Sequence, residues 1–440
     1  MMGNGFLKII ITQNNKKEKT KCFFSLFLLS LDRSFFPMYH KSKHKAPFEA
    51  LDGRMTKMEQ NRLYGIGEPV WVREIQDGIP AETTLDIIHA IGFSSWREWM
   101  HIPSILENPT TPKQEVVKRF TEILDKAAAL DIEVTGMSHS WFLPEGCMDK
   151  SGDSMPRRDL TPGSLYMQTL EMLEQSWYTL VSCFPQVPMW EVGNEWNIDP
   201  FLHPDGYYQN DRKERFTLSE KADIAVDMMY FSAKGIRRAN PKAKVVSVSP
   251  CPCDDELPHY LPVQYGIAKF FDMIYQRIHQ EGSWSQNNDD YFDLLAWHPY
   301  IFTQTCPTDV WADSNDAVYR VMEKYGDGHK KALLTEFGFT DQGDPEKEKD
   351  QANSYRRVFE YCAQRPYIYT LHLFRLFEDF RADTTRKTVD WGGVWEVYFG
   401  IFKEPENGLT PRTKALEMQK LTGSTADLWQ FRTDLHHSNA

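Results

Sequence analysis

The sequence has no cysteine pattern that would hold a small fold together. Its seven cysteines are an odd number spread through 440 residues, and Cys251 and Cys253 form the one close pair. A single residue separates these two, whereas the usual zinc and thioredoxin-like motifs have a two-residue spacer. A disulfide framework is therefore excluded, and we expect mostly reduced thiols in a cytosolic setting.

Positive charge and long apolar runs are also scarce. The 50 Lys and Arg residues are outnumbered by 62 Asp and Glu residues. The resulting net charge of −12 argues against nucleic acid, or an anionic membrane, as the main partner. The longest apolar run near the start, residues 22–31, is too short to span a bilayer as a helix.

The first 60 residues differ from the rest of the chain. The basic segment before the apolar run 22–31 resembles a signal peptide, but no small-x-small cleavage site follows. We expect residues 1–60 to be a disordered leader or a misassigned start, and the protein to be cytoplasmic. Secretion, with the run 22–31 acting as the signal, is the alternative.

A glycine-rich phosphate-binding turn is missing as well. After the first predicted strand the chain reads GIGEP, without the G-x-G-x-x-G spacing, which disfavours an open doubly wound sheet. The chain does contain eight short apolar runs alternating with longer amphipathic stretches. This alternation predicts a (β/α)8 TIM barrel with enlarged βα loops over residues 61–425, followed by a tail at 426–440.

Polar residues gather where the eight predicted strands end. The strands are expected at 63–67, 93–100, 132–140, 188–194, 244–249, 292–298, 332–338 and 367–374. The helices are expected at 81–91, 113–130, 165–183, 218–239, 267–280, 317–325, 347–363 and 411–421. The carboxyl ends of barrel strands meet around one opening, where active sites lie. The polar residues at these ends include Arg97, His101, His139, Asn194, Glu195, His298, Tyr300 and Glu336.

Two carboxylates stand out in this set. Glu195 and Glu336 each lie in an otherwise apolar strand end, where an unpaired charge is costly to bury. Two structural salt bridges are one explanation. The other is a pair of acids facing each other across the barrel opening, since carboxyl groups ~5 to 5.5 Å apart carry out retaining glycoside hydrolysis. One acid attacks the anomeric carbon, and the other protonates the leaving oxygen.

Three motifs on the expected strands carry a family resemblance. GNEWN ends the fourth strand, WHPY the sixth and TEFG the seventh, and the two glutamates are 141 positions apart. Together they resemble clan A retaining glycoside hydrolases, with family 5, the cellulase-like family, nearest and family 39 a relative. The likeness covers roughly residues 63–421. It implies a barrel enzyme that acts on an oligosaccharide or glycoside without a metal or cofactor.

The resemblance also implies a role for each site residue. Glu195 would be the general acid/base, Glu336 the nucleophile, and Asn194 the partner of the sugar 2-hydroxyl. The remaining residues would hold the nucleophile (Arg97 and Tyr300) or line the sugar subsite (His139, His298 and Trp141).

The end of the eighth predicted strand departs from this pattern. Such enzymes usually carry a tryptophan platform there, but this run continues through Phe374 and Arg375. Trp391 and Trp395 in the following loop are the candidates for a replacement platform, and Phe377 is another. The sugar, the linkage, the choice between exo and endo cleavage and the oligomeric state stay open.

Two other functional classes compete with the glycosidase. A metal-dependent barrel hydrolase is suggested by His101, His139 and His298 near strand ends, but the sequence has no H-x-H on the first strand and no H-E-x-x-H. A sugar-binding barrel without catalysis is the second alternative, and the presence of both glutamates argues against it.

Overall fold

The computed structural model describes residues 62–252, 265–300, 309–341, 344–378, 398–403 and 409–432. All of them belong to one compact unit, Met55–Ala440. The predicted leader, residues 1–60, lies outside the described residues. Within the predicted tail, residues 428–432 form a short 3-10 helix, η2, in which Leu428 and Phe431 are buried.

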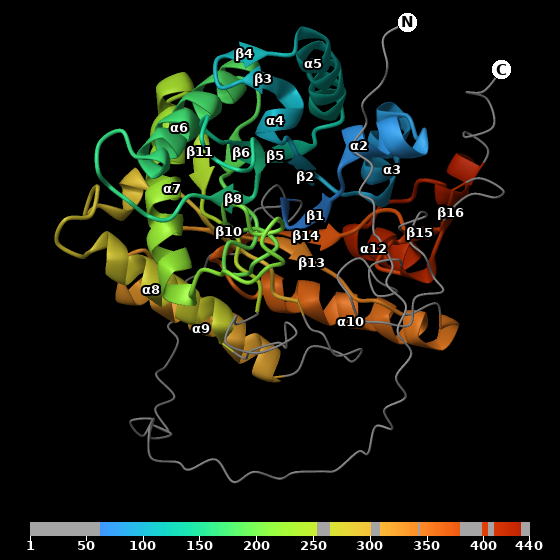
Figure 1. Ribbon diagram of the computed structural model, residues 1–440. Coiled ribbons are helices and arrows are strands. Elements are labelled where there is room, and N and C mark those ends of the chain that lie inside the picture. The colour runs from blue at the N-terminus through green and yellow to red at the C-terminus, as the bar shows by residue number, and fades with distance from the viewer. Residues whose placement is uncertain are drawn as a thin grey trace, which may run out of the picture. The chain divides into compact units, whose positions relative to one another are not determined.

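Eight parallel strands form the barrel (Figure 1). They are β1 (Tyr64–Gly67), β2 (Ser95–Trp99), β5 (Glu133–Met137), β9 (Met189–Glu191), β11 (Lys244–Val246), β12 (Leu295–Trp297), β13 (Ala332–Phe337) and β14 (Ile368–Phe374). Each strand pairs with its neighbour in chain order, and β1 pairs with β14. A parallel bridge between Val246 and Leu294 joins β11 to the start of β12. The predicted (β/α)8 barrel is confirmed.

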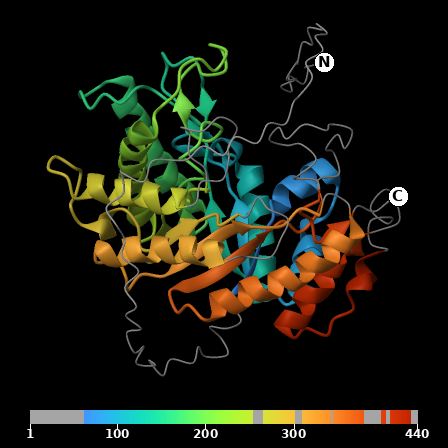
Figure 2. The same cartoon turned by 90° about the horizontal axis from the view of Figure 1, so that it is seen from below.

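A helix follows each strand along the chain, as parallel crossovers require. These helices are α3 (Ala81–Ile91), α5 (Gln114–Ala129), α6 (Leu165–Cys183), α7 (Leu218–Ala239), α8 (Gly266–Ile278), α9 (Asp309–Lys324), α10 (Pro345–Ala363) and α12 (Thr413–Thr422). Figure 2 shows α8 and α9 running side by side. Among the helices of the described residues, none is both long and apolar enough to cross a bilayer.

Two helix starts differ from the sequence prediction. The second predicted helix, 113–130, was expected to have Pro112 at its first turn, but α5 begins at Gln114. Pro112 instead belongs to β4 (Thr111–Pro112), which pairs with β3 (Leu106–Asn108) in a small antiparallel ribbon. The helix expected from residue 317 begins at Asp309. The prediction left out its first two turns, because five of the eight residues 309–316 are polar and the apolar pattern there is weak.

The sequence did not reveal helix α2 (Val70–Asp77), which follows β1. Its N-cap residue makes no side-chain hydrogen bond, so the exposed backbone N–H groups of its first turn need another acceptor. Glu98 of β2 supplies it, accepting from the Val70 N–H at 2.8 Å and the Trp71 N–H at 3.5 Å. The cap comes from a residue 28 positions away, which no local pattern could show. A second unpredicted helix, α4 (Ile102–Ile105), follows β2.

Glycine leaves room for large side chains inside the barrel. A Cβ at Gly65 would lie 2.4 Å from the His372 ring, and one at Gly136 would lie 2.6 Å from the Trp190 ring. His372 is fully buried, and its Nε2 lies 2.8 Å from the Ser95 hydroxyl. Burial and the neighbouring charge of Arg97 lower the pKa of His372 to about 3, so this histidine is a neutral packing residue.

A buried ion pair ties the first strand to the last at the carboxyl end of the barrel. Glu68 follows β1, and its carboxylate accepts from the backbone N–H groups of Leu376 and Phe377 at 2.8 and 3.2 Å. The guanidinium of Arg73, in α2, lies 2.5 Å from the other oxygen of Glu68. Both side chains are almost completely buried. Glu68 therefore depends on Arg73 to offset the cost of burying its charge, while Arg73 also pairs with Asp77 at 2.8 Å.

Replacing Arg73 by methionine should lower the free energy of unfolding by about 3 to 5 kcal/mol, because Glu68 would stay buried without its cation. Arg320 forms an exposed pair with Asp313 at 3.1 Å and provides the control, since Arg320→Met should cost ~1 kcal/mol at most. Urea denaturation followed by circular dichroism measures both changes. Equal losses in the two variants would contradict a role for the buried pair in closing the barrel.

Candidate active site

The polar residues predicted at the strand ends gather at one end of the barrel. Arg97 lies in β2, and Glu336 lies in β13. Asn194 and Glu195 follow β9, while His298 and Tyr300 follow β12. Because these strands run parallel in one barrel, their carboxyl ends bring side chains that are up to 239 residues apart into contact.

Glu195 is held in a turn of unusual backbone geometry. Its φ angle is +47°, in the left-handed region that residues with a Cβ rarely adopt. The Glu195 N–H donates to the Ser249 carbonyl at 2.9 Å, and the Glu195 carbonyl accepts from the Ile198 N–H at 3.0 Å. These two bonds fix the turn just beyond β9, so the Glu195 carboxylate projects over the end of the barrel from a rigid support.

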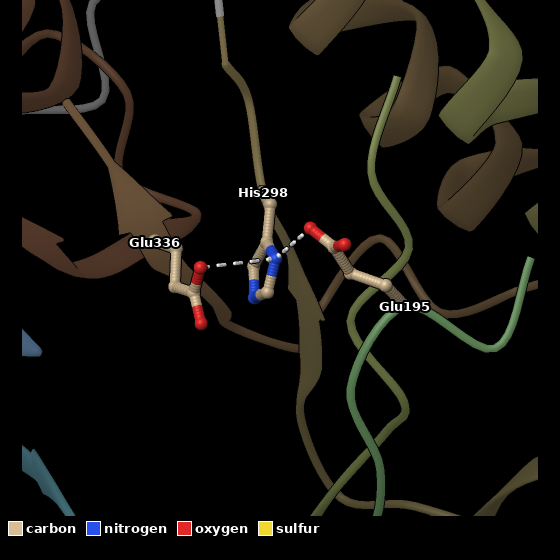
Figure 3. Close-up of side chains that lie close together, drawn as sticks. All are labelled: Glu195, His298 and Glu336. Atoms are coloured by element: carbon tan, nitrogen blue, oxygen red, sulfur yellow. Dashed lines mark hydrogen bonds and ion pairs between the residues drawn. The ribbon is translucent and has the colours of Figure 1, made fainter. Parts of the chain in front are cut away.

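An imidazole lies between the two catalytic candidates (Figure 3). The Nδ1 atom of His298 is 2.7 Å from Oε1 of Glu195 and 3.7 Å from Oε2 of Glu336. One carboxylate oxygen of each glutamate and one ring nitrogen of His298 all lie within 4.8 Å of one another. The two carboxyl groups are therefore neighbours facing the same space.

Arg97 connects most of the site. Its Nη1 atom lies 2.5 Å from Oε1 of Glu336, and its Nη2 donates to Oδ1 of Asn194 at 2.8 Å. The Nε and Nη2 atoms donate to the two carboxylate oxygens of Glu191 at 2.6 and 3.0 Å. Arg97 and Glu191 are fully buried. One guanidinium thus fixes the orientation of the nucleophile candidate and of the neighbouring amide.

Glu191 was not among the predicted site residues. It lay inside the predicted strand 188–194, whereas β9 ends at Glu191, and its Oε1 also accepts from the hydroxyls of Ser249 at 2.5 Å and Thr335 at 3.2 Å. A charged residue within an apolar strand was the available signal. The same desolvation argument that singled out Glu195 applies to Glu191.

The surroundings move the pKa values of the two glutamates in opposite directions. Burial raises the pKa of Glu195, and the negative charge of Glu336 adds to this, against the opposing effect of His298. Burial also acts to raise the pKa of Glu336, but the electrostatic effects of His298 and Arg97 and the hydrogen bonds from Arg97 and Tyr300 outweigh it. The pKa of Glu336 is consequently lowered. The Tyr300 hydroxyl donates to Oε2 of Glu336 at 3.0 Å.

The other predicted substrate-binding residues lie in different settings. His139 is partly exposed, and its Nδ1 lies 2.5 Å from Oδ1 of Asp153. Trp141, in β6 (Trp141–Phe142), is 1% exposed, and its indole N–H donates to the Ser154 carbonyl at 3.0 Å. Its predicted contact with substrate stays a prediction. Trp391 and Trp395 lie outside the described residues.

Two carboxylates and an imidazole are also a possible metal-ligand set. Glu195, His298 and Glu336 offer one ligand atom each within a suitable distance. Arg97, however, already places a positive charge 2.5 Å from Glu336 and would repel a second cation there. The arrangement favours proton transfer and nucleophilic attack over metal binding.

The fold is a (β/α)8 barrel with a polar site at the carboxyl ends of its strands, and solved structures share this fold. No protein-family model and no curated protein matches the sequence. Solved structures with the same fold include SghA, a virulence factor from Agrobacterium tumefaciens, at 12% identity. Its TM-score is 0.56, with 84% of this chain and 100% of that chain covered.

A broad-specificity endoglucanase of family 5 from Clostridium longisporum is similar at 12% identity and a TM-score of 0.56, covering 83% of this chain and 97% of that chain. A family 39 glycoside hydrolase from Bacteroides cellulosilyticus is similar at 13% identity and a TM-score of 0.51, covering 83% of this chain. The chain spans 65% of the length of that enzyme. The expected resemblance to clan A glycoside hydrolases is confirmed at the level of the fold.

The opposite pKa shifts can be measured directly. In a carbon-13 NMR titration of the carboxyl groups, Glu336 should titrate below, and Glu195 above, the usual glutamate pKa of ~4.3. Tyr300→Phe removes a donor to Glu336 and should raise the pKa of this carboxyl group. Tyr369→Phe, which removes a hydroxyl bonded to Glu133 at 2.6 Å, is the matched control and should change neither value. Equal pKa values for the two glutamates would contradict the electrostatic separation.

Proposed function

We propose that this protein is a retaining glycoside hydrolase that cleaves β-linked O-glycosidic bonds by double displacement. The observation that carries the proposal is the pair Glu195 and Glu336, whose carboxylate oxygens approach within 4.8 Å while their pKa values shift in opposite directions. Inverting enzymes hold the two carboxyl groups ~6.5 to 9.5 Å apart to admit a water molecule. The shorter separation supports direct attack by one carboxylate.

In the first step Glu336 acts as the nucleophile. Its carboxylate oxygen bonds to the anomeric carbon while the bond from that carbon to the leaving oxygen breaks. Arg97 and Tyr300 support this role, because their hydrogen bonds favour the ionised form of Glu336. The raised pKa of Glu195 keeps a proton on this group, and the proton passes to the leaving oxygen.

In the second step the roles of Glu195 reverse. The Glu195 carboxylate removes a proton from water, the resulting hydroxide oxygen bonds to the anomeric carbon, and the ester to Glu336 breaks. The Nδ1 atom of His298 is 2.7 Å from Glu195 and orients its carboxyl group through both steps. Net retention of configuration follows from two displacements at the same carbon.

The amide oxygen of Asn194 is already hydrogen-bonded within the protein. Its Oδ1 accepts from Arg97, which directs the opposite –NH2 group away from the guanidinium and leaves it as a donor. We infer that this group donates to the sugar 2-hydroxyl, an interaction that strengthens as charge develops on the ring in the transition state.

Glu336→Ala should reduce the turnover of aryl β-glycosides by at least about 10³-fold, because the covalent step is lost. Added azide should restore activity by attacking the anomeric carbon, giving a glycosyl azide of inverted configuration that NMR identifies. Glu323→Ala, an exposed glutamate on α9, is the control and should keep wild-type turnover. Wild-type turnover in Glu336→Ala would exclude it as the nucleophile.

The loss of activity in Glu195→Ala should depend on the leaving group of the substrate. Substrates with good leaving groups, such as dinitrophenyl glycosides, need no proton and should lose little activity in the first step. Substrates with poor leaving groups should lose about 10² to 10⁴-fold, the usual contribution of a general acid. The slope of log kcat/KM against leaving-group pKa measures the difference. An unchanged slope would remove Glu195 from the acid role.

A further inference from the structure

A row of ring side chains extends sideways from the catalytic residues. His101 follows β2, and its pKa is lowered well below the usual value by burial, by His139 and by the charge of Arg97, which keeps the imidazole neutral. The His101 ring lies 4.2 Å edge-on from His139, and Phe201 lies edge-on to His139 at 5.3 Å. The row links the end of β2 to the loop that follows Glu195.

Asp153 continues this row. Its Oδ1 accepts from Nδ1 of His139 at 2.5 Å and from the Ser140 hydroxyl at 3.2 Å. Its side chain keeps 22% of its surface exposed. Among the described residues, no hydrogen bond reaches Oδ2, so this partly exposed carboxylate keeps one oxygen available to a ligand.

Tyr208 stands next along the same surface. Its side chain is 52% exposed although its ring contacts two other aromatic side chains. His203 and Tyr207 lie nearly perpendicular to it, with ring centroids at 5.0 and 5.1 Å. The Arg212 guanidinium lies 5.2 Å from the ring centroid. The His203 N–H donates to the Asp153 carbonyl at 3.3 Å, so the segment that carries Asp153 lies beside the ring that Tyr208 contacts.

Reciprocal hydrogen bonds hold the two loops that carry Asp153 and Tyr208. The Asp205 carboxylate accepts from the backbone N–H groups of Met148 and Asp149 at 2.8 and 2.9 Å. In return, the Asp149 carboxylate accepts from the Gly206 N–H at 3.3 Å and from Gln209 at 2.7 Å. The strands β8 (Ser154–Met155) and β10 (His203–Pro204) also pair (Figure 1). These bonds order the loop backbone that carries Tyr208, and the contacts with His203, Tyr207 and Arg212 position its ring.

We propose that Tyr208 and Asp153 form a second sugar subsite, so that the substrate is an oligosaccharide with at least one further ring beyond the one at the catalytic glutamates. An exposed tyrosine ring packs against the apolar C–H face of a pyranose, and a carboxylate accepts charge-assisted hydrogen bonds from its hydroxyls. Because the loops are already ordered, little conformational entropy is lost on binding. This inference rests on the proposed glycosidase function.

The test compares chain lengths. The probes are β-linked gluco-, manno-, xylo- and galacto-oligosaccharides of two to five units, with the corresponding aryl monoglycosides. For the sugar that the wild-type enzyme prefers, kcat/KM should rise by about tenfold when the second subsite is filled. Tyr208→Ala should remove most of this gain, whereas Tyr208→Phe, which keeps the ring, should preserve it. Asp153→Asn should reduce it through a higher KM.

Trp429→Ala provides the matched control, since it removes another exposed aromatic ring, on η2, which packs against α3. It should leave the chain-length dependence unchanged. If aryl monoglycosides are cleaved but no oligosaccharide is preferred, or if Tyr208→Ala keeps the full gain, the second subsite is refuted and the glycosidase assignment survives. If the wild-type protein cleaves none of the probes, the proposed function itself fails.

Discussion

The buried guanidinium of Arg97 is the interaction on which the site depends. It contacts Glu191, Glu336 and Asn194 at once, with no exposed surface of its own. Removing such charges from water usually costs about as much as their attraction returns, so this network is poorly explained as a source of stability. Its effect is electrostatic: it holds Glu336 ionised beside Glu195, whose pKa moves the other way. Two identical side chains acquire different chemistry because only one of them touches the cation.

The sequence predicted those parts of the fold and site that follow from strand topology. Eight apolar runs determine a closed ring, and a closed ring brings the ends of β9 and β13 together whatever lies between them. Glu195 and Glu336 could therefore be paired across 141 positions. Glu191 was missed because the predicted strand continued to residue 194, whereas β9 ends at Glu191, whose side chain shares the interior with Arg97.

Features that depend on contacts between distant segments could not be predicted. Helix α2 is capped by Glu98 from another strand, and Pro112 pairs with Leu106 instead of opening a helix. Trp141 illustrates the same limit, because its residue type fits a sugar platform while its ring packs beside Trp196 with 1% exposure. Nothing local shows which side of a loop faces the core. Asp153 lies 14 positions from His139, and only the folded loop brings them to 2.5 Å.

The barrel and its loops meet different physical requirements. The strands need small residues inside, as Gly65 and Gly136 show, because bulky partners such as His372 and Trp190 already fill the interior. The candidate catalytic side chains project from the ends of these strands, so the close packing of the barrel also fixes their positions. The enlarged loops lie outside the barrel sheet and contain only the short β8–β10 pair, and Asp149 and Asp205 add to it by bonding each other's backbone segments. A carboxylate that accepts two backbone N–H groups orders a loop without an apolar core. Recognition surfaces can therefore change in sequence while the catalytic strands stay constrained.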